Sequence, residues 1–205
     1  MAGKTTVACT QEQYEVLITT IFQGIGSAVM PNPRVATILE IEANTGLRIG
    51  DVLSLKRGSI IKDGTRYRFN ITEQKTGKKR TFTVPNEVYS FIEEYCEIAG
   101  IDDGEIIFPI TVRAVQKHLA RVCEYLGDDY DNISSHSFRK FWGSNLYYAN
   151  DCDIELVRRL FQHSSVAVTS RYLGVTDKRM DAALANNVNL LPIDKKGGRN
   201  EKTKG

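Results

Sequence analysis

The chain has 205 residues, 41% of them hydrophobic and 25% charged, with a formal net charge of +2. This composition and length are typical of an ordinary soluble protein with one domain, or at most two small ones, and they allow a sizeable core. No stretch approaches the roughly 18 apolar residues that cross a bilayer, and the N-terminus lacks the apolar segment of a signal peptide, so we expect no membrane association and a cytoplasmic location.

Three helices are predicted at the start of the chain. Residues 11–23 repeat apolar side chains at the spacing of one helical face, and Thr10 precedes them as a suitable N-cap. Residues 34–43 are almost entirely apolar and predict a buried helix. A short third helix is expected from Asp51 to about Lys56.

The pattern then changes to short β-prone runs at 59–62, 67–72 and 80–84. Turn sequences separate them, Asp63-Gly64 first and the Lys75 to Lys78 stretch second. These runs predict a small three-stranded antiparallel sheet.

The rest of the chain is predicted to be helical, at 86–99, 111–126, 135–149, 153–161, 165–173 and 177–188. The fold class is therefore mainly α with one small antiparallel sheet (α+β). We expect an N-terminal extension at 1–9, one domain at 10–190 and a basic, flexible tail at 191–205, of which the last eleven residues are expected to be disordered.

Cysteine spacing and charge distribution narrow the functional classes. The four cysteines are scattered without a C-x-x-C pair, so we expect reduced, mostly buried thiols and neither a zinc site nor a disulfide framework. Residues 56–80 hold nine basic side chains against two acids, whereas residues 85–110 hold seven acids and no Lys or Arg. Such polarity suits a face turned to a polyanion such as DNA, although a solvated charged hairpin fits the charges equally well.

Four separated segments hold the side chains that could carry chemistry. In the first, Arg48 follows a Gly-containing turn, and Asp51 three residues later could hold its guanidinium ready to clamp an anion. In the second, Lys75 lies at a predicted hairpin tip, where it could reach a DNA groove and protonate a leaving oxygen. Arg48 could equally be a surface residue, and hairpin-tip lysines are mostly solvated.

The third and fourth segments are predicted helices. His136 and Arg139 are three residues apart in a first helical turn, where the helix dipole favours an anion. The alternative is that Phe138 and Phe141 pack inward while this polar pair faces water. His163 precedes an N-cap sequence and lies nine residues before Tyr172, which by its spacing alone would be a core residue.

Together these segments resemble the tyrosine recombinase (phage integrase) family over about residues 10–188. The shared features are T-G-L-R with an acid three residues on, K-T-G-K before a strand ending in V-P, H-x-x-R, and H-S-S followed by a tyrosine. The resemblance implies that Tyr172 is the nucleophile, that Lys75 is the general acid, and that the remaining catalytic residues are Arg48, His136, Arg139 and His163. Departures from the pattern are Lys140, Gln162 and Asp51, where many members have histidine, glycine and glutamate.

The resemblance also implies the reaction. Tyr172 would attack a phosphodiester, forming a 3′-phosphotyrosine and a free 5′ hydroxyl, with no cofactor, metal or ATP. His136 is a suitable proton acceptor, while the arginines and histidines would stabilise the charge that develops on the phosphate. The expected partners are double-stranded DNA and further copies of the chain, in a dimer or tetramer on DNA, and additional DNA contacts are expected from Lys56, Arg57, Lys78, Lys79, Arg80 and Lys140.

Several alternatives stay open at this stage. A type IB topoisomerase uses the same tyrosine chemistry without exchanging partners, and a catalytically silent DNA-binding module or an unrelated helical interaction protein belongs to another class. The chain could be an excised catalytic domain or a single-domain member. Residues 177–188 could dock on a neighbouring protomer or pack on their own domain. The target sequence, the direction of reaction and any accessory proteins cannot be read from the sequence.

Overall fold

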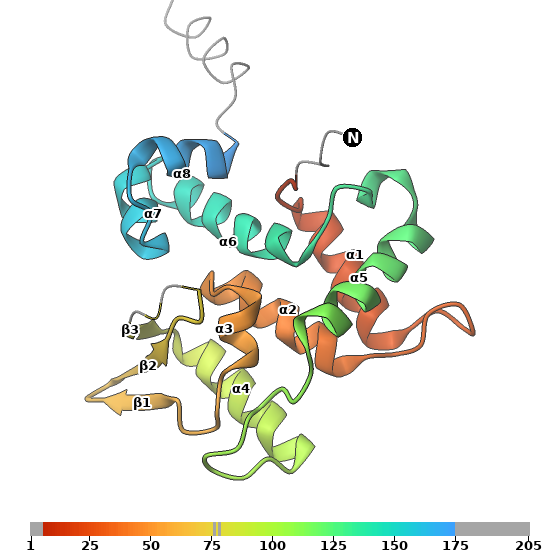
Figure 1. The fold of residues 1–205 in the computed structure, drawn as a ribbon, viewed down its shortest axis with the longest axis horizontal. Coiled ribbons are helices and arrows are strands. Elements are labelled where there is room, and N and C mark those ends of the chain that lie inside the picture. Colours follow the sequence, from red (N-terminus) through yellow and green to blue (C-terminus); the bar gives the residue numbers. More distant parts are fainter. Residues whose placement is uncertain (1–5, 76, 78, 175–205) are drawn as a thin grey trace, which may run out of the picture. The chain divides into compact units, whose positions relative to one another are not determined.

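The computed structural model of the protein describes residues 6–75, 77 and 79–174, with only the backbone of Arg80 (Figure 1). The helices and strands follow in this order: α1 (Gln11–Gln23), α2 (Pro33–Thr45), α3 (Ile49–Leu53), β1 (Ile60–Asp63), β2 (Arg66–Thr72), β3 (Lys79–Val84), α4 (Asn86–Ala99), α5 (Val112–Leu126), a 3-10 turn (Asp128–Tyr130), α6 (Ser135–Ala149), α7 (Ile154–Phe161) and α8 (Val166–Leu173).

Side-chain caps explain where the first helices begin. Thr10 Oγ1 accepts a hydrogen bond from the Gln13 amide at 3.1 Å, and the Gln13 side chain accepts one from the Thr10 amide at 3.0 Å. This reciprocal capping box satisfies two amides that the helix itself leaves without partners. Asn32 caps α2 in the same position, with Pro33 as the first helical residue.

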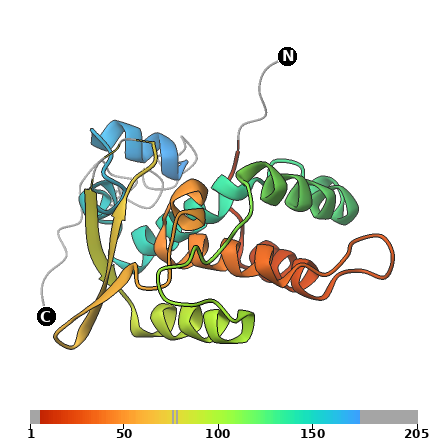
Figure 2. The ribbon, with the colours of Figure 1, turned by 60° about the horizontal axis from the view of Figure 1, so that its bottom comes forward.

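Helix α2 forms the centre of the core. It packs against α1, α4 and α6, and nine of its thirteen residues are buried. Figure 2 shows α2 enclosed between these helices. Two ionisable side chains share this interior, because Glu42 is fully buried on α2 and Arg139 is 1% exposed on α6. Charges in a core are costly unless they are compensated, so this pair points to a site.

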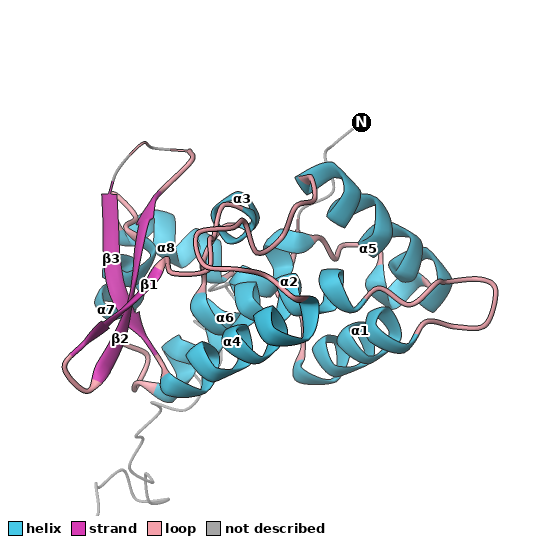
Figure 3. Ribbon diagram, turned by 90° about the horizontal axis from the view of Figure 1, so that it is seen from below, coloured by secondary structure: helices cyan, strands magenta, loops and turns pink. Residues whose placement is uncertain are grey.

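The sheet has the strand order β1-β2-β3, with both pairs antiparallel (Figure 3). Phe69 on the central strand is fully buried and opposes Ile60 on one side and Phe82 on the other. Tyr67 stacks on Tyr89 of α4, with ring centroids 3.6 Å apart, which fixes the sheet to that helix. The β2–β3 connection, which contains Lys75, therefore projects from an anchored sheet.

The predicted fold class is confirmed, with differences at element ends. The third helix spans Ile49–Leu53 instead of 51–56, because extended Arg48 starts it and the Ser54 amide closes it on the Gly50 and Asp51 carbonyls. The 3-10 turn was not predicted. The expected helix at 177–188 and the tail lie outside the described residues.

Two further expectations concern the whole chain. Of the four cysteines, Cys9, Cys96 and Cys123 are buried free thiols as expected, whereas Cys152 is exposed. Within the described part of the chain, every helix is too short or too polar to cross a membrane.

Candidate active site

A glycine turn after α2 connects the two arginines of the candidate site. Gly46 has φ +61°, and a Cβ atom there would collide with the Trp142 ring, so both conformation and space require glycine. Arg139 Nη1 donates a hydrogen bond to the Gly46 carbonyl. The first turn of α6 is thereby bound to the turn that ends two residues before Arg48.

Arg48 is held by buried carboxylates. Its Nη1 lies 2.9 Å from Glu73 Oε2 and 3.9 Å from Asp51 Oδ2, and both acidic side chains are 1% exposed. The sequence predicted Asp51 as the partner, but the shorter contact is with Glu73, directly after β2. Arg48 itself is 26% exposed, so a fixed guanidinium faces the surface and is ready for an anion.

His136 and Arg139 differ in burial although they share one helical turn. His136 is exposed, whereas the Arg139 guanidinium is buried and lies 4.3 Å from the centroid of the Phe161 ring. Phe138 and Phe141 pack inward. The alternative of a polar pair facing water therefore fails for Arg139.

His163 is positioned by the junction between α7 and α8. Gln162 adopts a left-handed conformation with φ +55°, which explains why glycine suits this position. The ring of His163 stacks on Phe161, and its Nδ1 lies 3.1 Å from Oγ1 of the fully buried Thr169. Arg158 Nη1 donates to the His163 carbonyl at 2.9 Å. The orientation of this imidazole is thus fixed on two sides.

Tyr172 lies between the two histidines near the end of α8. Its ring centroid is 5.1 Å from that of His136 and 5.1 Å from that of His163, with edge-on geometry in both pairs. The hydroxyl oxygen is buried, and the Arg139 guanidinium is the polar group beside it. Burial raises the pKa of Tyr172 above its ordinary value, while the nearby Arg139 guanidinium acts in the opposite direction. The phenol is therefore neutral and requires a proton acceptor before it can attack.

Both histidines are held in the neutral form. Partial burial of the ring, followed by the charges of Arg139, Lys140, Arg48 and Lys75, lowers the pKa of His136 to about 4. Burial, followed by the charges of Arg139 and Arg48, lowers the pKa of His163 to about 4. A neutral imidazole at physiological pH can accept a proton from a phenol or donate a hydrogen bond.

A hollow of about 370 Å³ opens beside the tyrosine. Its lining includes three basic side chains, His136, Lys140 and Arg171, together with Tyr172 itself. Lys140 Nζ lies 5.4 Å from the centre of the Tyr172 ring and donates to the Thr6 carbonyl at 2.8 Å. Arg171 was not singled out from the sequence.

Lys75 lies at the edge of this arrangement. Its side chain is exposed, and its charge contributes to the lowered pKa of His136. The structure thus packs Arg139, His163 and Tyr172 around Phe161, with His136 against Tyr172. It places Arg48 within electrostatic range of both histidines and the tyrosine.

The other basic side chains predicted to contact DNA differ in exposure and in ion pairing. Lys56 and Lys79 are exposed. Arg57 is 22% exposed and forms an ion pair with Glu93 at 3.2 Å, so its charge is already balanced within the protein. Lys78 and the side chain of Arg80 lie outside the described part of the structure.

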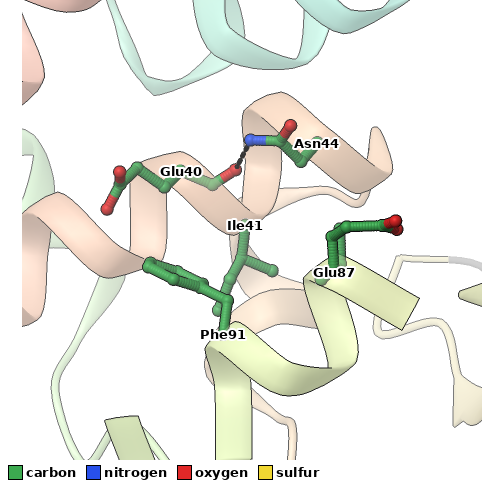
Figure 4. Close-up of a pocket in the computed structure, with 6 residues that line it drawn as sticks. Glu40, Ile41, Asn44, Glu87 and Phe91 are labelled. Atoms are coloured by element: carbon green, nitrogen blue, oxygen red, sulfur yellow. Dashed lines mark hydrogen bonds between the residues drawn. The ribbon is translucent and has the colours of Figure 1, made fainter. Parts of the chain in front are cut away.

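A second hollow, of about 160 Å³, lies between α2 and α4 (Figure 4). Its floor contains Ile41 and Phe91, and its rim contains Glu40 and Glu87. Asn44 Nδ2 donates to the Glu40 carbonyl at 2.8 Å within this wall. The acidic rim would repel a phosphate, so this hollow is separate from the candidate site.

The profile of the phage integrase family matches residues 9–179. The chain belongs to the phage integrase family. Among curated relatives, the Bacillus subtilis (strain 168) protein named probable integrase/recombinase YoeC is 30% identical over 148 residues, which are 68% of this chain and 77% of that protein. Tyrosine recombinase XerC of Bradyrhizobium diazoefficiens is 27% identical over 155 residues, 72% of this chain but 47% of XerC. The chain thus spans about half the length of that relative.

Solved structures of recombinases share the fold. One is the XerH site-specific recombinase, solved as a post-cleavage complex with its difH substrate. It aligns with a TM-score of 0.65 at 17% identity, and the alignment covers 90% of this chain and 54% of the XerH chain. The catalytic domain of bacteriophage HP1 integrase aligns with a TM-score of 0.59 at 16% identity, covering 89% of this chain and 95% of its own. The fold is therefore that of a tyrosine recombinase catalytic domain.

Four supporting residues escaped the sequence reasoning: Glu42, Glu73, Phe161 and Thr169. Glu42 and Phe161 act on Arg139, and Glu73 acts on Arg48, from distant parts of the sequence. Thr169 contacts His163 from the next helix, and sequence spacing does not reveal any of these contacts. A weak signal existed for Glu73, because it is the only acid between Asp63 and Lys79 in a strongly basic stretch.

Proposed function

We propose that this chain is the catalytic domain of a site-specific recombinase, which cleaves and rejoins double-stranded DNA through a 3′-phosphotyrosine at Tyr172. The observation that carries the proposal is the buried Tyr172 hydroxyl beside two neutral histidines and the Arg139 guanidinium. A buried phenol beside a guanidinium that favours its ionised form, with neutral imidazoles in contact to take its proton, suits a nucleophile that attacks a phosphate.

The first step is attack on phosphorus. Tyr172 Oη forms a bond to the phosphorus while its proton passes to a neutral imidazole, with His136 as the candidate acceptor. Negative charge grows on the non-bridging oxygens, where the guanidinium groups of Arg48 and Arg139 lie ready, and the site needs little reorganisation because both are held by protein contacts. His163, fixed through Nδ1 by Thr169, presents its other ring nitrogen as a donor.

The second step is departure of the 5′ oxygen. The bond between phosphorus and the 5′ oxygen breaks, and Lys75 supplies the proton that this oxygen takes up. The phosphotyrosine ester replaces the DNA phosphate ester that was broken, so the energy of the bond is kept. A 5′ hydroxyl from a second duplex can therefore reverse the reaction without ATP.

DNA and a second copy of the chain are the proposed partners. Two solved structures that share the fold support them: XerH is bound to its difH substrate, and a lambda integrase dimer is bound to a COC′ core site. The exposed Lys56 and Lys79 and the basic hollow beside Tyr172 support DNA contact in this chain.

The test is formation of a covalent protein–DNA adduct. Nicked suicide duplexes made from DNA flanking the gene trap the intermediate, which migrates slowly on a denaturing gel. We expect the wild-type chain to form the adduct, and Tyr172→Phe to bind the same DNA without forming it. An adduct that persists in Tyr172→Phe would rule out the assignment.

The same assay distinguishes a recombinase from two alternative functions. A silent DNA-binding module would bind the duplex without any adduct. A type IB topoisomerase would form the adduct and relax a supercoiled plasmid without joining DNA from two different duplexes. Strand exchange between two labelled duplexes therefore identifies a recombinase.

A further inference from the structure

The connection between β2 and β3 is joined to the Arg48 turn by two buried carboxylates. Glu73 Oε2 accepts from Arg48 Nη1 at 2.9 Å, and Asp51 Oδ1 accepts from the backbone amide of Gln74 at 2.9 Å. Thus an acid from each segment binds a donor of the other. Both carboxylates are 1% exposed, although they lie at the base of an exposed loop.

This pair of contacts fixes the residue before Lys75. The Gln74 amide is held by Asp51, and the Glu73 carbonyl accepts from the Gly77 amide at 2.8 Å, which closes the turn around Lys75. The exposed Lys75 side chain consequently starts from a backbone position defined relative to Arg48. Its charge already reaches His136 across the site.

Burial of the Glu73 carboxylate costs solvation free energy. A loop with only a structural role would not need such a buried charge. A carboxylate removed from water loses solvation free energy unless partners replace the water. Glu73 regains that energy from Arg48, whose remaining guanidinium donors are left for a phosphate. The same side chain therefore serves the arginine and the loop.

We propose that Glu73, with Asp51, is a positioning residue that sets Lys75 at the leaving 5′ oxygen while it holds Arg48 for the phosphate. The inference rests on the proposed function and deepens it, because it names the groups that determine where the general acid acts. Its distinctive consequence is that loss of Glu73 impairs protonation of the leaving group more than attack by the tyrosine.

A substrate that needs no general acid separates these steps. In a suicide duplex with sulfur in place of the 5′ bridging oxygen, Tyr172 Oη still attacks phosphorus. The bond between phosphorus and sulfur then breaks, and the electron pair leaves on sulfur as a thiolate. Because a thiol is far more acidic than an alcohol, this leaving group requires no proton.

The experiment compares adduct formation from the oxygen and sulfur duplexes in Glu73→Ala, Glu73→Gln, Asp51→Asn and Lys75→Ala. With oxygen, we expect Glu73→Ala and Lys75→Ala to be slower than wild type by about 100-fold, the usual contribution of a general acid. With sulfur, we expect Lys75→Ala to recover to the wild-type rate and Glu73→Ala to recover at least tenfold. Glu73→Gln and Asp51→Asn keep the side-chain shape and should show smaller defects, also reduced by sulfur.

Asp63→Asn is the matched control, because Asp63 is another carboxylate of this sheet paired with an arginine, Arg68 at 2.8 Å. It should leave both rates unchanged. Thermal unfolding of each variant shows whether it is folded. If Glu73→Ala does not fold, Glu73→Gln provides the test.

Three outcomes would overturn the inference. A Glu73 defect of equal size with oxygen and sulfur would mean that Glu73 acts only through Arg48. Normal rates in Glu73→Ala and Glu73→Gln would mean that it positions neither group. Absence of a Tyr172-dependent adduct with both duplexes in the wild-type chain would refute the recombinase proposal itself and this inference with it.

Discussion

The two sides of the candidate site are built differently. On the helical side, Arg139, His163 and Tyr172 pack around Phe161, and the Arg139 guanidinium is almost completely buried. On the sheet side, Lys75 is exposed and only the base of its loop is fixed, through Glu73 and Asp51. The difference matches the two proposed tasks: charge stabilisation benefits from groups fixed in advance, whereas a proton donor has to approach DNA from outside.

The largest effect on the rate of adduct formation is expected from substitution of Arg139, on the helical side of the site. Arg139→Lys keeps the charge but loses the planar guanidinium that donates to the Gly46 carbonyl and stacks on Phe161. We expect the rate of adduct formation to fall by about 100- to 1,000-fold, as when an enzyme loses a donor to a developing oxyanion. Single-turnover assays on the suicide duplex measure it.

The control for this variant is Arg159→Lys, a 74% exposed arginine paired with Glu155 on α7. It should react at the wild-type rate. If Arg139→Lys also retained that rate, Arg139 would have to be removed from the site.

The next largest effect is expected on stability at Glu42, whose carboxyl group is fully buried. Burial raises the pKa of Glu42 well above its ordinary value, against the opposing charge of Arg139. The folded state therefore binds a proton that the unfolded state releases. Stability from this group is complete below the unfolded pKa near 4.5 and is lost as pH rises toward the folded pKa.

We accordingly expect Glu42→Gln to be more stable than wild type at pH 8, by about 1 kcal/mol or more, and equally stable near pH 4. Urea unfolding at a series of pH values measures the difference, with the exposed Glu12→Gln as control. Lower stability of Glu42→Gln at pH 8 would mean instead that an ionised Glu42 is paired with Arg139.

The smallest effect is expected at Thr169. Thr169→Val keeps the shape of the buried side chain but removes the partner of His163 Nδ1. Loss of one orienting hydrogen bond is worth about 1 kcal/mol, so adduct formation should slow by about fivefold at unchanged DNA affinity. Thr19→Val, on the exposed face of α1, is the control. An unchanged rate in Thr169→Val would show that the helical packing alone orients His163.

The same contrast explains what could be predicted from the sequence. Helices and strands followed from local signals, such as the Thr10 cap and the turn at Asp63-Gly64, because each depends on neighbours within a few residues. The proposed catalytic residues came from a family resemblance, since spacing alone would place Tyr172 in the core. Glu42 lay in a segment correctly predicted to be buried, but its neighbour Arg139 is 97 positions away and no local pattern connects them.

The central claim is that Tyr172 carries the DNA, and identification of the modified residue tests it most directly. After the wild-type chain is trapped on a suicide duplex, nuclease digestion leaves a short nucleotide on the nucleophile, and trypsin releases residues 172–178 as one peptide. Mass spectrometry should find the nucleotide on Tyr172 in that peptide. A nucleotide on Tyr147 or Tyr148, in the separate peptide 141–158, would contradict the account.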